Sequence, residues 1–182
     1  QQMTPPDEHH FKKVVLAEGL PRPVMLDFDA RNRIYIAESV GNIVILDQAS
    51  GLFKKAGFLP TYDGNEFGLI GLKLDPNFEQ NGFIYLHYFR KDSVRMECIS
   101  RFTMQDDSLI MSSEKNYLHI RHDNTCCHTA GGMAFDTHDN LYIATGDNTD
   151  AFFTHYALTD DQPGHLFDDA LRSAGNTNDY RG

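Results

Sequence analysis

The chain has 182 residues, of which 41% are apolar and 23% are charged, and its net charge is −10. This composition is ordinary for a single globular domain and excludes wholesale disorder. The acidic balance argues against binding to nucleic acids or anionic membranes, since both need a basic face on the protein. No run of about 18 apolar residues is present, so we expect no membrane span.

The beginning of the chain, residues 1–10, is polar and contains two prolines, which predicts a flexible lead-in. The chain starts at Gln1 rather than Met and shows no signal pattern, so we expect a processed or cut chain. Residues 11–182 are then expected to form a single domain that is incomplete.

A strand–turn–strand unit recurs three times after this lead-in. Each copy has an alternating apolar strand, a turn that begins with aspartate, and a second strand centred on tyrosine. The units span residues 23–38, 68–88 and 131–145, with Tyr35, Tyr85 and Tyr142 at the centres of their second strands. Their turns begin at Asp29, Asp75 and Asp136, which we interpret as structural turn residues.

A unit that recurs at about 50 residues is typical of a β-propeller blade. Further alternating segments at 43–46, 96–103 and 117–121 supply extra strands between the units. The nearest helix candidate, residues 165–173, is short. Because propellers usually need about 4–8 blades, the sequence predicts an all-β fold with about three blades of a larger propeller.

Three segments contain residues that a structural repeat alone does not require. They read DGNEFGLIGLKLDPNF with NGFIY behind it (63–85), HTAGGMAFD running to LYIATGD (128–147), and NTNDYRG (176–182). Their order and spacing resemble the glucose/sorbosone dehydrogenase family, the soluble PQQ-dependent aldose dehydrogenases built on a six-bladed propeller. The resemblance covers about residues 20–182 and implies that this chain is the N-terminal half of such a propeller.

The family resemblance implies oxidation of a sugar hydroxyl or aldehyde, with a base that takes a proton while hydride passes to the quinone PQQ. By resemblance the base is His128, because histidine titrates near neutral pH. Asp147 would hold its tautomer, and Glu66 would contact the cofactor or the substrate. The competing structural interpretations are a turn or core histidine at 128, a turn cap at 147 and a solvated turn residue at 66.

The family also uses Ca²⁺ to hold PQQ, and the carboxylates between 147 and 161 could bind such a cation. We assign no metal ligand, because the family's metal ligands and the basic residues that clasp PQQ lie in later blades. The 182-residue piece alone is therefore expected to be inactive. Cys126 and Cys127 precede His128 directly, as a strained vicinal disulfide or as two reduced thiols.

Two other functions remain open beside the dehydrogenase. One is a non-catalytic propeller module that binds a protein or a glycan, since fold does not fix function. The other is a Ca²⁺-dependent lactonase, which would need carboxylate and amide ligands such as Glu66, Asp147 and Asn148 around an axial metal. The resemblance further implies a sugar substrate, a periplasmic or extracellular location, and a cytochrome c as a possible electron acceptor.

Overall fold

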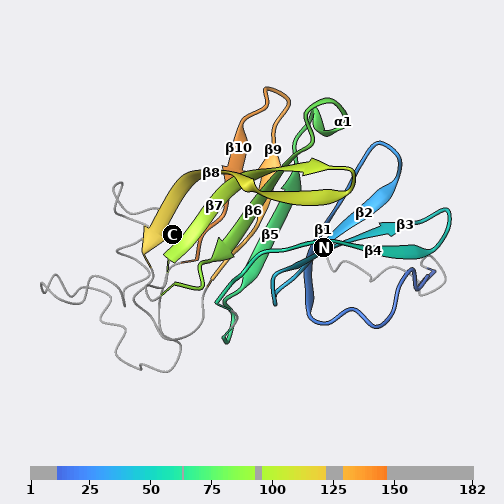
Figure 1. Ribbon diagram of the computed structural model, residues 1–182, viewed down its shortest axis with the longest axis horizontal. Coiled ribbons are helices and arrows are strands. Elements are labelled where there is room, and N and C mark those ends of the chain that lie inside the picture. Colours follow the sequence, from blue (N-terminus) through green and yellow to red (C-terminus); the bar gives the residue numbers. More distant parts are fainter. Residues whose placement is uncertain (1–11, 63, 93–95, 122–128, 147–182) are drawn as a thin grey trace, which may run out of the picture.

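The computed structural model describes residues 12–62, 64–92, 96–121 and 129–146, and their regular structure is almost entirely β (Figure 1). The first sheet contains β1 (Pro23–Phe28), β2 (Arg33–Glu38), β3 (Asn42–Asp47) and β4 (Leu52–Phe58). The second sheet contains β5 (Leu69–Leu74), β6 (Phe83–Phe89), β7 (Met96–Gln105) and β8 (Ser108–Arg121). β9 (Met133–Phe135) pairs with β10 (Leu141–Ile143) in a third, two-stranded sheet.

Each four-stranded sheet is an antiparallel meander in chain order, which is the architecture of a propeller blade. The prediction of an all-β, repeated fold is confirmed, with two blades and the first two strands of a third within the described residues. The helix candidate at 165–173 lies outside them. The helix that the structure does describe, α1 (Phe78–Asn81), is a single turn between β5 and β6 that cannot cross a membrane.

The sequence pattern does not mark β4 and marks only the end of β8, which begins at Ser108 rather than at residue 117. Both are the outermost strands of their sheets. In β4 only Ala56 is buried, while Lys54 and Lys55 are exposed. The strand is therefore held by its hydrogen bonds to β3 and carries little apolar alternation.

The two complete sheets pack face to face, and their inner strands are buried on both sides. In β2, Tyr35 and Ala37 point to the second sheet, whereas Ile34 and Ile36 point to the opposite face. Ala17 and Leu20, which precede β1, cover that opposite face. The second sheet contributes Leu69, Leu72, Leu74, Ile84, Leu86, Tyr88, Cys98, Phe102, Met104 and Leu109 to the shared core.

The aspartate and tyrosine of each repeat unit are linked by hydrogen bonds. Asp75 accepts from Asn81 Nδ2 at 2.8 Å and from the Tyr85 hydroxyl at 3.1 Å. In the third unit the Tyr142 hydroxyl donates to Asp136 at 3.3 Å. Burial and the Asp75 carboxylate raise the pKa of Tyr85 to about 12, so the phenol stays protonated as a donor. These contacts confirm that Asp75 and Asp136 are structural turn residues.

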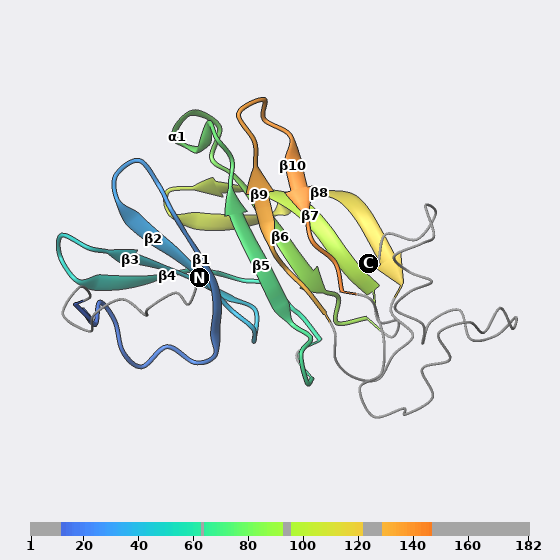
Figure 2. The same cartoon turned by 180° about the vertical axis from the view of Figure 1, so that it is seen from behind.

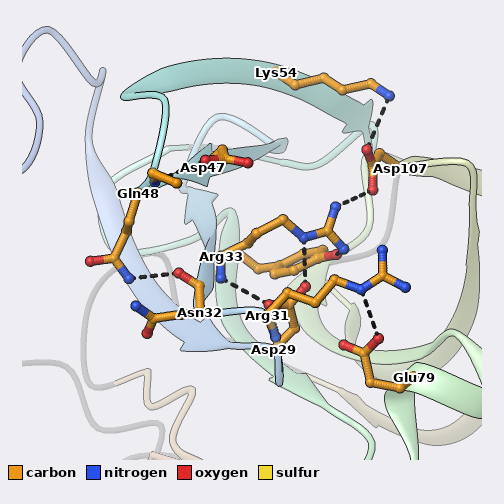
Figure 3. A network of polar contacts seen from close by, with 11 residues as sticks. Asp29, Arg31, Asn32, Arg33, Asp47, Gln48, Lys54, Glu79 and Asp107 are labelled. Carbon is orange, nitrogen blue, oxygen red and sulfur yellow. Dashed lines mark hydrogen bonds and ion pairs between the residues drawn. The ribbon is translucent and has the colours of Figure 1, made fainter.

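In the first unit Arg33 mediates this link and also joins the two sheets (Figure 3). Its Nε donates to Asp29 at 2.7 Å, and its Nη1 donates to Asp107 of the β7–β8 turn at 2.6 Å. Its Nη2 donates to the Tyr35 hydroxyl at 2.9 Å. Although burial opposes the charge, the bonds to Asp107 and Asp29 raise the pKa of Arg33 above its ordinary value. A permanently charged guanidinium therefore ties the second sheet to the first.

Replacing Arg33 with methionine is expected to lower the free energy of unfolding by about 3 kcal/mol, because it leaves the buried Asp29 carboxylate without its counter-charge. The side chain of Asp29 is 0% exposed and that of Arg33 is 17% exposed. Arg31→Met is the matched control. The Arg31 side chain is 70% exposed and pairs with Glu79 at 3.2 Å, so its loss is expected to cost less than about 1 kcal/mol. Urea unfolding measures the free energy of unfolding of both variants. Equal losses in the two variants would contradict the role assigned to Arg33.

Asp107 is also expected to make stability depend on pH. Burial opposes its charge, but the hydrogen bond from Arg33 holds the pKa of the Asp107 carboxyl below its usual value. A lowered folded-state pKa stabilises the protein above the unfolded value, about 3.9, and this contribution is lost as the pH falls through the folded value. Asp107→Asn should therefore have a lower free energy of unfolding than wild type at about pH 7. The difference between the two proteins should be smaller at about pH 3. A constant difference across that range would refute this.

Candidate functional site

The strands β5 and β9 begin at the same end of the molecule, and β9 lies beside β5 in both views (Figures 1 and 2). The loop before β5 carries Glu66, and the segment 129–132 leads into β9. Two sequence motifs that are more than 60 residues apart, at Glu66 and Thr129, therefore meet at this end.

Glu66 contacts Thr129 through both its backbone and its side chain. The Thr129 hydroxyl donates to the Glu66 carbonyl oxygen at 3.1 Å. The Thr129 amide donates to Glu66 Oε2 at 3.4 Å, a long bond. The Glu66 side chain is exposed, so its carboxylate is open to a ligand as well as to Thr129.

A buried aromatic cluster supports the loop that carries Glu66. Phe67 is fully buried, and its ring centroid lies 4.7 Å from that of Phe89 and 5.5 Å from that of Tyr62. The Phe67 amide donates to the Gly64 carbonyl at 3.0 Å, which closes the turn around Glu66. Glu66 thus points outward from a turn whose next residue is anchored in the core.

Glycines let the sheets approach each other closely at this same end. Gly68 adopts φ +128°, and a Cβ there would lie 2.2 Å from the Ser39 carbonyl oxygen of the first sheet. A Cβ on Gly71 would lie 2.2 Å from the Gly131 carbonyl oxygen of the segment before β9. The backbones of the three units therefore touch where side chains would hold them apart.

The structure brings together some of the sequence-predicted site residues and does not describe others. Glu66 lies at the meeting point. His128 and Asp147 lie outside the described residues, as do Cys126 and Cys127. The segments that lead to His128 and Asp147 are hydrogen-bonded to each other, since the Gly131 amide donates to the Ala144 carbonyl at 3.3 Å and the Ala144 amide donates to the Gly132 carbonyl at 2.9 Å.

Sequence reasoning missed two features of this region. Thr129 follows the proposed base directly, but nothing in the sequence indicated its contact with Glu66. The second feature is a buried contact between His87 of β6 and Glu97 of β7. Their separation in sequence matches no catalytic or metal-binding spacing, so only the strand pairing reveals it.

The contact between Glu66 and Thr129 offers oxygen ligands rather than cationic ones. Among the described residues, no group of three His, Cys, Asp or Glu side chains is placed to hold a metal ion. The Glu66 carboxylate and the Thr129 hydroxyl suit a sugar hydroxyl, or one side of a cation that is bound mainly from elsewhere. The carboxylates of PQQ need cationic partners, and neither contact of Glu66 involves a basic side chain. The described part of the site therefore fits a substrate better than the quinone's carboxylates.

A family model and several solved structures match this chain, and all of them are sugar dehydrogenases. The family model for Glucose / Sorbosone dehydrogenase matches residues 20–166. A solved glucose dehydrogenase is 25% identical with a TM-score of 0.66, over 73% of this chain and 43% of that chain. The PQQ-bound aldose sugar dehydrogenase from Streptomyces coelicolor is 21% identical with a TM-score of 0.66, over 74% of this chain and 41% of that chain.

The soluble aldose sugar dehydrogenase from Escherichia coli, in its apo form, is 23% identical with a TM-score of 0.62, over 71% of this chain and 39% of that chain. The two aldose sugar dehydrogenases support the fold alone at this level of identity. The chain spans about two fifths of the length of the solved structures it matches.

Gly71→Ala is expected to destabilise the protein by about 2 kcal/mol or more, because the new Cβ would overlap the Gly131 carbonyl and lie 2.8 Å from His87 Cβ. Gly132→Ala is the matched control, since among the described residues its Cβ would meet only Ala144 Cβ, at an ordinary 3.6 Å. Thermal and urea unfolding of both variants give the comparison. Similar stabilities would show that β9 does not pack on β5 as described.

Proposed function

The chain belongs to the glucose/sorbosone dehydrogenase family, and from this premise we propose that it forms part of a PQQ-dependent sugar dehydrogenase. The substrate is a sugar with an oxidisable hydroxyl or aldehyde, of the aldose or sorbosone type. Since the chain spans about two fifths of the solved structures it matches, the activity is proposed for the complete propeller.

The observation that carries the proposal is the contact of Glu66 with Thr129, the residue next to His128. This contact supports a single site made from the first and second family motifs. The hydrogen bonds between Ala144 and the glycines 131 and 132 support placing Asp147 in the same region as His128. Three polar residues from two motifs would then share one end of the propeller.

In the proposed site His128 takes the proton from the sugar hydroxyl, and Asp147 accepts a hydrogen bond from the imidazole and so fixes its tautomer. Glu66 accepts a hydrogen bond from a second sugar hydroxyl, which orients the substrate and agrees with its exposed carboxylate. Among the described residues the hydrogen bonds of Glu66 are to the uncharged Thr129, so we favour the substrate for Glu66.

PQQ, when bound, accepts the hydride, and Ca²⁺ would hold it. We assign neither group a ligand among the described residues. The proposed location is the periplasm or the outside of the cell, and the proposed electron acceptor is a cytochrome c. The cofactor, the Ca²⁺ ion, the location and the electron acceptor are proposed from the family rather than from contacts of this chain.

We expect His128→Ala in the complete protein to bind PQQ in the presence of Ca²⁺ as wild type does, and to lower kcat by about 10²- to 10⁴-fold, since that is the usual contribution of a general base. PQQ titration followed by absorbance measures binding, and reduction of a dye by added aldoses measures turnover.

His138→Ala is the matched control for this substitution, because His138 is an exposed residue of the β9–β10 turn. It should keep wild-type kcat. If the wild-type protein binds no PQQ, the dehydrogenase proposal fails and a non-catalytic binding module becomes the better explanation. If it binds PQQ and His128→Ala keeps full turnover, the base is another residue.

A further inference from the structure

His87 and Glu97 form a fully buried polar pair in the middle of the second sheet. The imidazole Nε2 is hydrogen-bonded to Glu97 Oε1, and both side chains are 0% exposed. Their cross-strand neighbours are apolar and buried: Ile99 lies opposite His87, and Phe89 lies opposite Glu97. The other ring nitrogen, His87 Nδ1, has no hydrogen-bond partner among the described residues.

Stability alone does not explain such a pair. Two apolar side chains of similar volume at these positions would generally serve as well or better, because burying a charged or strongly polar pair carries a desolvation penalty. The unpartnered Nδ1 adds a further cost. The intact pair therefore has no stability advantage over two apolar side chains, which points to another role.

The position of His87 points to that role. Its strand β6 alternates, so that Ile84, Leu86 and Tyr88 face the first sheet, and His87 faces the opposite way, toward β9. His87 pairs with Gly71 across β5 and β6. A Cβ on Gly71 would lie 2.2 Å from the Gly131 carbonyl oxygen and 2.8 Å from His87 Cβ, so His87 and the segment before β9 both border Gly71.

We propose that His87, held in one orientation by Glu97, is a positioning residue for the backbone segment 129–131. A ring fixed by a directional hydrogen bond gives this segment a rigid support, which a freely rotating apolar side chain would not provide. Glu66 contacts the same segment through Thr129. The consequence for catalysis rests on the proposed function, because segment 129–131 follows His128 directly.

The test compares His87→Leu, His87→Gln and the double variant His87→Leu/Glu97→Leu in the complete protein. Amide hydrogen exchange of residues 129–132, read by peptide mass spectrometry, is the primary measurement because it needs neither sugar nor quinone. Exchange in this segment is expected to become at least about tenfold faster in both leucine variants. His87→Gln keeps an amide donor for Glu97 and is expected to stay within about threefold of wild type.

The double variant separates positioning from stability. It is expected to recover most of the unfolding free energy that His87→Leu loses, yet to keep fast exchange at 129–132. Its kcat for sugar oxidation is expected to fall about tenfold with KM unchanged, as for loss of an interaction that matters in the transition state. Wild-type exchange at 129–132 in the double variant would overturn the proposal.

Tyr88→Phe is the matched control, because Tyr88 is adjacent on β6 but faces the first sheet, and its hydroxyl donates to Glu114 of β8. It should leave exchange at 129–132 unchanged. Equal acceleration there would mean a general loosening of the sheet and would also overturn the proposal. A wild-type protein that oxidises no sugar would refute the proposed function, while the exchange measurement would still decide the role of His87.

Discussion

The arrangement of the three units depends on direct contact between backbones at one end of the sheets. The Ser39 carbonyl lies against Gly68, and the Gly131 carbonyl lies against Gly71, at separations that leave no room for a side chain. Because these contacts set the distance between neighbouring sheets, the apolar faces behind them can meet and exclude water. The same contacts bring the loop of Glu66 to the segment of Thr129, so the packing of the fold and the assembly of the site share one cause.

The sequence predicts the strands that alternate within the repeat units, and it does not mark β4 or the first part of β8. Units such as 23–38 stand out because Ile34 and Tyr35 both need apolar surroundings, one on each face of the sheet. β4 has no such signal, since its exposed lysines belong to an edge strand. The spacing of the repeat units can therefore be predicted from the sequence, whereas the outer strands of the sheets are seen only in the structure.

The site was predictable only where the family motifs mark it. Glu66 was singled out from its motif, and its exposed side chain next to the buried Phe67 agrees with a role in binding. Its contact with Thr129 joins residues from two blades, and the His87–Glu97 pair joins two neighbouring strands. Such contacts depend on register and on sheet packing, which leave no periodic trace in a single sequence.

The ion pairs of Arg33 with Asp29 and Asp107 affect how cooperatively the two blades fold. Asp106 and Asp107 adopt φ values of +50° and +58°, which a two-residue hairpin normally assigns to Asn–Gly. The Asp107 carboxylate reaches Arg33 only when both sheets are docked. The β7–β8 hairpin thus receives part of its support from the preceding blade, which couples the two blades into one cooperative folding unit rather than two independent modules.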